Sequence, residues 1–360
     1  MRVAAVTRRK LRRWVGTVSV SAGTAVFSGA VAILVDSVVQ GGTLHWPYLA
    51  GSTALGAALS GGGAWLLATV RSAVGIGLAA MDHAGDVERY QDEADSFARF
   101  GHGIFTAQTS VQVTVETPAD LKFLRARLRA ALRTLHEIEQ RARQTGLLFQ
   151  GRPEVGFHVG RWLNQAGGRI DLYSDARHGG PETHFAAIRL TPAISAAPRH
   201  LDRAVYRLTE TGFSEAQPTA WADLPRLLSE HTDTCMGLAI NLNGPVDEAG
   251  FVGPVLASAT QEGATVAVFL ALPAPADDLD APGRQLASSR EEYESTVAAI
   301  LAAARHMRAA PGLVYLKTPA VIPVALGRYL YGKDWIPMRH HRDDPRHPVK
   351  YDRFADTSNR

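Results

Sequence analysis

Cysteine is nearly absent from this 360-residue chain, since Cys235 is its only thiol. A single cysteine excludes an internal disulfide and any zinc site built from several cysteines. Charge of one sign is not in excess either, because 38 Lys and Arg stand against 35 Asp and Glu. A net charge of +3 excludes the global basic field of a DNA-coating protein. The chain therefore fits a reducing compartment, and we expect no DNA or RNA duplex as a partner.

The common catalytic signatures are also missing. The sequence has no Gly-x-Ser-x-Gly elbow, no Walker phosphate loop, no kinase motif set and no His-Glu-x-x-His. Gly75-Ile76-Gly77 and Gly101-His102-Gly103 are only fragments of glycine loops. His340, His341 and His347 lie in a Pro-containing tail without regular ligand spacing. We therefore predict no catalytic residue, no cofactor and no metal site.

Two long uncharged runs stand near the N-terminus. Residues 15–35 and 47–70 contain no Asp, Glu, Lys or Arg, and a helix of the first length rises about 31 Å, close to a hydrocarbon core. Six basic residues precede the first run, whereas the connection 36–46 has no Lys or Arg. This excess of positive charge places the N-terminus in the cytoplasm. We predict a multi-pass protein of the plasma membrane with two spans and both termini cytoplasmic.

Two features of this segment leave alternatives open. The basic start, the apolar run and Ala30-Val31-Ala32 are also typical of a cleaved signal peptide, although a second apolar run follows directly. Small residues recur at every fourth position of the second run, which is typical of close helix packing. These residues are Ser52, Gly56, Ser60, Ala64 and Ala68. Such packing could lie within one hairpin or between copies of it.

The rest of the chain has the pattern of an α/β domain. Strands are predicted at 110–115, 183–190, 236–242 and 265–272, and helices at 118–144 and 285–307. Strands that alternate with helices favour α/β layers over a bundle or a β-sandwich. The polar segment 82–109 is predicted to be a stalk or linker between this domain and an N-terminal tail and hairpin at 1–81.

The helix predicted at 118–144 carries a row of basic residues. Arg125, Arg129 and Arg133 are spaced four apart and therefore share one face. Such a row suits phosphates, a membrane surface or plain solvent.

One phrase occurs twice in the chain. Gly160-Arg161-Trp162-Leu163 matches Gly327-Arg328-Tyr329-Leu330, and each copy lies between two apolar runs. We predict a strand, a short helix and a strand for each copy, with the first strands at 154–159 and 312–317. A repeated unit indicates a domain of two similar halves, assigned to 110–215 and 216–360. Paired units commonly form a site between them.

Polar residues follow the predicted strands. Ligands of open α/β sheets bind outside the carboxyl ends of strands, where amides and cations can bind phosphates or base edges and aromatic rings can stack on a base. The candidate ligand-binding residues are His158, Arg161, Trp162, Tyr173, Asn241, Asn243, Lys317, Thr318 and Arg328. His158 and Arg161 are predicted to hold in the first half the place of Lys317 and Thr318 in the second. Arg161 and Arg328 have an alternative role, in which they brace their helices.

The stretch 312–330 resembles the end of SAVED domains. Its strand leads through Lys317-Thr318-Pro319 into an apolar helix with Leu326-Gly327-Arg328. SAVED domains sense cyclic oligonucleotides in the bacterial anti-phage systems called CBASS, and they consist of two fused, Rossmann-like halves related to CARF domains. The resemblance extends over roughly 118–354. It departs at 336–341, which lacks the expected aromatic-acidic ending.

This resemblance implies a membrane effector of bacterial antiviral defence. A synthase would supply a cyclic oligonucleotide, the cytoplasmic domain would bind it, and a ligand-induced homo-oligomer would permeabilise the inner membrane by acting on its lipid bilayer, in abortive infection. One alternative is a membrane-anchored ring nuclease that degrades the messenger, with Lys317 or His158 as the basic residue. Another is a structural membrane protein whose domain docks a protein.

Overall fold

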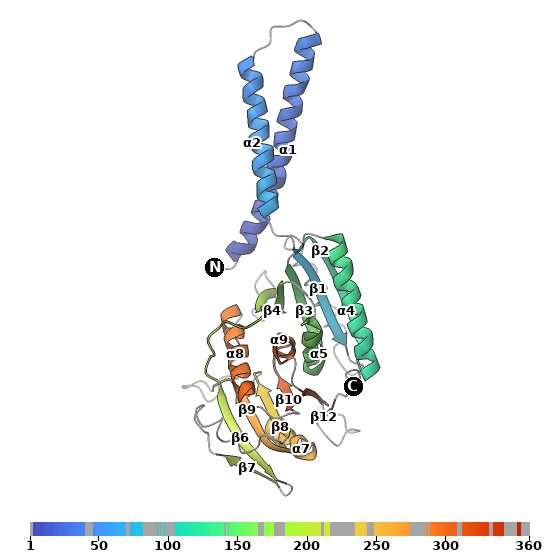
Figure 1. The fold of residues 1–360 in the computed structure, drawn as a ribbon, viewed down its shortest axis with the longest axis vertical. Helices are drawn as coiled ribbons and strands as arrows, with labels where there is room; N and C mark the ends of the chain where they lie inside the picture. The colour runs from blue at the N-terminus through green and yellow to red at the C-terminus, as the bar shows by residue number, and fades with distance from the viewer. Residues whose placement is uncertain are drawn as a thin grey trace.

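The computed structural model describes most of the chain. The described residues are 3–39, 46–69, 73–81, 105–139, 144–164, 169–175, 184–209, 212–216, 235–242, 248–273, 289–307, 312–330, 334–341 and 351–353, with 92, 94, 97, 142 and 286. They form a helical hairpin and an α/β domain (Figure 1). The predicted α/β class is therefore confirmed.

The hairpin consists of α1 (Val3–Val39) and α2 (Trp46–Thr69), which lie side by side. Small residues form their contact: a Cβ added at Gly63 would lie 2.7 Å from the Gly16 carbonyl oxygen. One added at Gly23 would lie 2.7 Å from the Gly56 carbonyl oxygen. Gly56, a member of the predicted stripe, thus serves a contact within one hairpin.

The described residues include one helical segment, Val15–Val35 of α1, that is long and apolar enough to cross a membrane. The second predicted span, 47–70, forms helix α2 up to Thr69 but does not meet the same criterion. The first span is therefore supported by length and composition, and the second stays a prediction.

The first sheet has five strands in the order β2-β1-β3-β4-β5. Its strands are β1 (Ala73–Met81), β2 (Ala107–Thr114), β3 (Gln144–Gly151), β4 (Arg169–Asp175) and β5 (His184–Leu190). The first four are parallel, and β5 is antiparallel to β4. Two helices cover one face, α4 (Pro118–Ile138) after β2 and α5 (Pro153–Leu163) after β3.

Helix α4 begins where the sequence predicts it. Thr117 accepts a hydrogen bond from the Asp120 amide, and the Asp120 carboxylate accepts one from the Thr117 amide at 2.8 Å, which forms a capping box. The leucines of one helix face, among them Leu121 and Leu128, are buried against the sheet.

The second sheet has the order β12-β11-β10-β8-β9-β6-β7. Its strands are β6 (Asp202–Thr209), β7 (Gly212–Ala216), β8 (Cys235–Asn241), β9 (Ala264–Ala271), β10 (Gly312–Lys317), β11 (Trp335–His340) and β12 (Tyr351–Arg353). Its helical segments are η1 (Glu248–Val252), α7 (Gly253–Gln261), α8 (Arg290–His306) and α9 (Val321–Tyr329). The apolar residues of α7 pack on one face, and those of α8 and α9 on the other.

The two sheets repeat one topology. Strands β8, β9, β10, β11 and β12 follow the chain order and the spatial order of β1, β2, β3, β4 and β5, with α8 in the place of α4 and α9 in that of α5. The second sheet differs by the hairpin β6-β7 added beside β9. The described residues thus form two similar halves, as the repeated phrase predicted.

The boundaries of these halves differ from the prediction. The first sheet starts at Ala73 within the segment 1–81 that was assigned to the hairpin, and β6 and β7 join the second sheet although 110–215 was assigned to the first half. The glycine fragment at 75–77 lies in β1, the strand between β2 and β3. A fragment cut at the predicted boundary, after residue 81, would therefore lack β1, a central strand of the first sheet.

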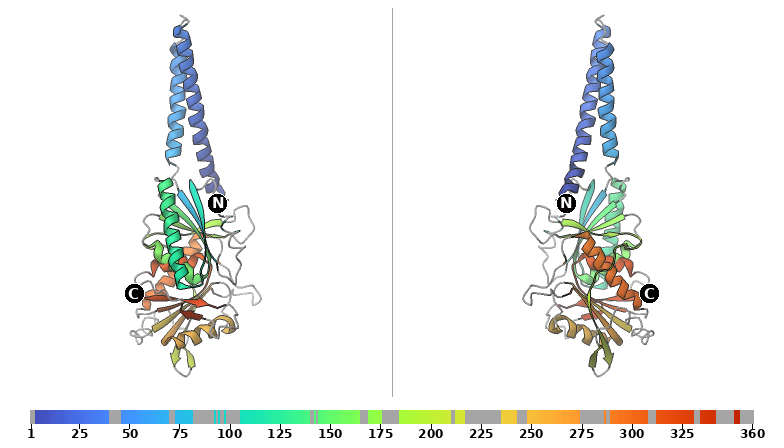
Figure 2. Two further views of the ribbon diagram at one scale, coloured as in Figure 1. Left: turned by 90° about the vertical axis from the view of Figure 1, so that its right-hand side faces the viewer. Right: turned by 90° about the vertical axis from the view of Figure 1, so that its left-hand side faces the viewer.

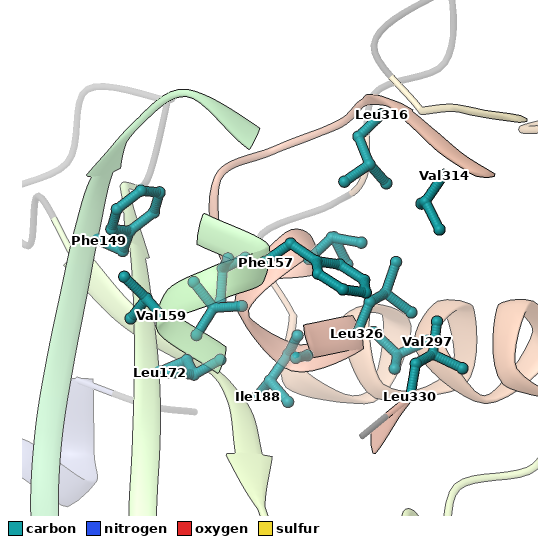
Figure 3. Close-up of a cluster of buried hydrophobic side chains, with 14 of the residues drawn as sticks. Phe149, Phe157, Val159, Leu172, Ile188, Val297, Val314, Leu316, Leu326 and Leu330 are labelled. Atoms are coloured by element: carbon teal, nitrogen blue, oxygen red, sulfur yellow. The ribbon is translucent and has the colours of Figure 1, made fainter. Parts of the chain in front are cut away.

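Helices α5 and α9 join the two halves between the sheets (Figure 1). A Cβ at Gly327 would overlap the Phe157 carbonyl, 2.8 Å from its carbon, and a Cβ at Gly160 would lie 2.9 Å from the Arg328 amide nitrogen. Figure 3 shows Phe157 between the two helices beside Leu326. One apolar core consequently extends through both halves. The hairpin projects from the end of the molecule occupied by the first sheet (Figure 2).

Replacing Gly327 with alanine tests this contact. Because the obstacle is backbone of α5, relief requires the helices to separate, and we expect Gly327→Ala to lower the free energy of unfolding by about 3 kcal/mol or more. Urea unfolding of the full chain in detergent, followed by circular dichroism, measures it. Gly237→Ala is the matched control, since its Cβ would meet Ala267 at an ordinary 3.4 Å. Equal stability of the two variants would contradict the proposed packing.

Candidate functional site

The carboxyl ends of β8 and β10 bring three of the predicted residues together. Asn241 and Lys317 are register partners at the ends of these parallel strands, and the Leu242 amide donates a hydrogen bond of 2.8 Å to the Lys317 carbonyl oxygen. Asn241 and Thr318 are buried, and Lys317 is half-buried. The strand ends therefore hold an amide, an ammonium group and a hydroxyl within a few residues of one another.

Helix α9 starts directly beyond these strand ends. Its first turn contains no acidic residue, so the positive end of the helix dipole lies beside Lys317 with no carboxylate from that turn to neutralise it. An ammonium group and a helix N-terminus both favour an anion, and an amide can bind a phosphate oxygen or a base edge. This edge suits a ligand that carries phosphate.

The equivalent edge of the first half has different chemistry. If Gly160 is matched with Gly327, Lys317 corresponds to Gln150 and Thr318 to Gly151. A Cβ at Gly151 would lie 2.7 Å from the Ala80 carbonyl oxygen, which explains a glycine there. In the first turn of α5, buried Glu154 approaches Arg152 at 3.9 Å. A carboxylate occupies the positive end of that helix, whereas the first turn of α9 has none, so of these two equivalent helix starts that of α9 favours an anion.

His158 does not lie at a strand end, contrary to the prediction. Residues 154–159 belong to α5, since Pro153 at the first helical position favours a helix, and the strand is the preceding β3. His158 corresponds to Ala325 in the middle of α9, is buried, and stacks on Trp162 one turn later with centroids 6.3 Å apart. This buried position within a helix does not favour the predicted ligand contact.

The two arginines of the repeated phrase donate hydrogen bonds to backbone carbonyl oxygens across the interface between the halves. Arg328 donates a hydrogen bond of 2.6 Å to the Leu163 carbonyl oxygen at the end of α5. Arg161 donates to the Trp335 carbonyl oxygen at the start of β11, and its guanidinium lies 5.0 Å from the Phe157 ring centroid. This geometry favours the bracing role that the sequence left open.

The predicted aromatic contacts lie elsewhere. Tyr173 is buried on the face of the first sheet opposite α5, with its ring centroid 5.3 Å from that of Phe97 and 5.8 Å from that of Phe105. Trp162 is half-buried and packs against the core. Neither ring stands beside Lys317, and Asn243 lies outside the described residues.

Gln150 and Arg152 are strand-end residues that the sequence reasoning missed. Both follow from aligning the repeated phrase backwards from its glycine, a count that places Gln150 opposite Lys317. This signal is visible in the sequence, but the largely apolar residues 154–159 favour a strand there, and the true strand ends at Gly151.

A buried ionic cluster links the two halves near the amino ends of β3 and β4, at the edge of the first sheet opposite the carboxyl ends of its parallel strands. Asp171 of β4 accepts hydrogen bonds from Gln144 and from Arg189, the latter at 2.9 Å, and lies 3.6 Å from Arg290 of α8. Glu294 of α8 accepts a bond of 2.9 Å from the Arg189 amide. Burial raises the pKa of Asp171 above its ordinary value, and the nearby arginines only partly oppose this.

The raised pKa of Asp171 determines the direction in which its contribution to stability changes with pH. The folded chain binds this proton more tightly than the unfolded chain does, so the contribution of Asp171 to stability falls as pH rises from its ordinary pKa of 3.8 through the folded value. Asp171→Asn removes that titration. We expect urea unfolding from about pH 4 to about pH 7 to show the wild type losing stability relative to the variant as pH rises. A change in the opposite direction would refute the assignment.

No protein-family model and no curated protein matches this chain. Among solved structures, it is similar to the Cap4 SAVED/CARF-domain receptor of Acinetobacter baumannii, determined with the cyclic trinucleotide 3'3'3'-cAAA. The sequence identity is 9 % and the TM-score 0.41, and the match covers 85 % of this chain and 59 % of that one.

Proposed function

We propose that this protein is a membrane-anchored sensor of a cyclic oligonucleotide. The observation that carries the proposal is the pairing of Lys317 with Asn241 at the start of α9, inside a domain of two similar α/β halves. Phosphates and base edges are the groups that such a set binds. The stretch 312–330 resembles the end of SAVED domains, and this resemblance suggests that the phosphate-bearing ligand is a cyclic oligonucleotide.

Because the two halves differ in charge at these strand ends, the ligand would bind in one preferred orientation. One phosphate lies at Lys317 and the start of α9, where the helix dipole and the ammonium group act together. The equivalent position at the start of α5 holds Glu154, which disfavours a second phosphate there. Uncharged parts of the ligand would face that half.

The hairpin is the proposed effector part. Helix α2 ends at Thr69 and β1 starts at Ala73, so a central strand of the first sheet is joined to α2 by a short connection. Ligand-induced assembly of copies would bring hairpins together and permeabilise a bacterial inner membrane, with both termini cytoplasmic. A ligand drives such assembly only if it binds the assembled state more tightly. A cyclic-nucleotide synthase would supply it in antiviral defence of the CBASS kind.

Calorimetric titration of the full chain in detergent with cyclic di-, tri- and tetranucleotides tests the sensor. We expect one of them to bind, and Lys317→Ala to weaken that binding by about tenfold to a hundredfold, because a charge-assisted hydrogen bond contributes about 1.5–3 kcal/mol. Asn241→Ala should weaken it by about tenfold. Lys122→Ala, on the exposed face of α4, is the matched control and should bind like the wild type. No binding by any cyclic nucleotide would refute the proposal.

Dye release from liposomes that contain the full chain tests the effector role. The messenger identified by titration should cause release, and Lys317→Ala should shift the messenger concentration required by the same factor as it shifts binding. Binding without release would refute permeabilisation and leave the sensor in place. Chromatography of the messenger afterwards separates a sensor, which returns it intact, from a ring nuclease, which cleaves it.

A further inference from the structure

Arg290 at the start of α8 reaches across the interface between the halves to the first sheet. Its guanidinium lies 3.6 Å from the Asp171 carboxylate of β4 and donates a hydrogen bond of 3.3 Å to the Ala186 carbonyl oxygen of β5. Asp171 is only 2 % exposed. The proposed messenger site does not use this ion pair. A buried charged contact therefore joins two halves that otherwise share one apolar core.

The equivalent place in the second half is apolar. Asp171 is the register partner of Gly146. The repeated phrase matches Gly146 with Leu313, whose register partner is Ile336. Ile336 packs against buried apolar side chains. The repeated fold thus does not require a carboxylate at this point, and a buried ion pair often stabilises a fold no better than apolar residues do. This difference favours a role for Asp171 other than folding.

Two opposing effects act on the ion pair. Burial disfavours the charged carboxylate and raises the pKa of Asp171, whereas Arg290 and Arg169 act against this effect. The free energy that holds the contact closed is therefore smaller than the attraction of the pair alone. A ligand with a modest preference for the open contact can separate such a pair, because a two-state equilibrium shifts by the difference in affinity for the two states.

The pair lies between the candidate site and the hairpin. On one side, α8 is followed by β10, whose last residue is Lys317. On the other side, Gln144 donates a hydrogen bond to Asp171 and is the register partner of Ala73. Ala73 is the first residue of β1, which follows the end of α2 at Thr69 closely. The pair therefore connects the helix that precedes the messenger site with the strands that follow the hairpin.

The contact between α5 and α9 determines how the halves can move. The two backbones touch at Gly160 and Gly327, so these helices cannot come closer together. Arg290 lies away from this contact, beside β4 and β5. A rotation of one half about the α5–α9 contact would therefore change the distance between Arg290 and Asp171.

We propose that the ion pair between Arg290 and Asp171 is a lock, which holds the halves in the messenger-free arrangement and opens when a messenger binds at Lys317. Opening returns the Asp171 carboxylate to water and frees the edge of the first sheet at Gln144 and Ala73. The hairpin is thereby released for assembly. This regulation rests on the proposed function, on messenger binding and on permeabilisation alike.

Dye release from liposomes that contain the full chain, with no nucleotide added, tests the lock. Arg290→Gln leaves Asp171 buried without its partner across the interface, and we expect spontaneous release to rise by about tenfold, the change that about 1.4 kcal/mol produces in a two-state equilibrium. Adding Asp171→Asn removes the buried charge and restores the net charge of the cluster. Release by this double variant should return to near the wild-type rate.

Calorimetric titration gives a second readout of the same equilibrium. The cyclic di-, tri- or tetranucleotide that binds the wild type should bind Arg290→Gln about tenfold more tightly, because the apparent dissociation constant falls as the binding-competent fraction rises. Arg290→Lys keeps a cation at this position without the planar fork of arginine. Its dye release and its affinity should lie between those of the wild type and of Arg290→Gln.

Glu292→Gln is the matched control. Glu292 lies two residues further along α8 and pairs at 2.8 Å with Arg199, which precedes β6 of the second sheet. This variant breaks an ion pair of the same helix without touching the Arg290–Asp171 contact. Its dye release without nucleotide should equal that of the wild type.

The outcomes separate the lock from the proposed function. If the wild type releases dye with a cyclic nucleotide but Arg290→Gln and Arg290→Lys without nucleotide stay as tight as the wild type, the lock is overturned and the proposed function stands. Leakage that Asp171→Asn does not reverse, or that Glu292→Gln shares, also overturns the lock, because it reports general disruption. A wild type that releases no dye with any of these nucleotides contradicts permeabilisation, and the lock with it.

Discussion

The contact between α5 and α9 depends on two glycines, because any side chain at Gly160 or Gly327 would overlap the backbone of the opposite helix. Close approach of these helices lets one core extend through both sheets. It also brings each arginine of the repeated phrase within hydrogen-bond distance of the other half. The strand ends that form the candidate site are positioned by this contact, since α5 and α9 follow directly from β3 and β10.

The two halves differ in side chains at their equivalent strand ends. Both halves place a strand end and a helix start at equivalent points, yet Lys317 and Asn241 occupy one of them while Gln150 and the buried Glu154 occupy the other. A carboxylate at a helix N-terminus stabilises the helix and disfavours an anion there. The two halves thus share one framework, and a few side chains make their equivalent strand ends chemically different.

The first sheet connects that site to the edge from which the hairpin departs. Strand β1 pairs with β2 and β3 along its length and follows α2 after a short connection. The ionic cluster around Asp171 ties α8 of the second half to the same edge. A change in the angle between the halves would therefore act on the strand that follows α2, because α8 of the second half is tied to β4 and β5 of the same sheet.

Local pattern determined much of this protein. The capped helix α4, the buried strands β8, β9 and β10, and the apolar run of α1 follow from periodicity, capping and length. Tertiary structure decided the rest. A fully buried helix and a buried strand are equally apolar, so residues 154–159 resembled a strand, and β1, rich in alanine and glycine, resembled a continuation of the hairpin. The face on which Tyr173 lies and the bracing by Arg161 and Arg328 depend on the sheet and on the packing of α5 against α9, which no local pattern encodes.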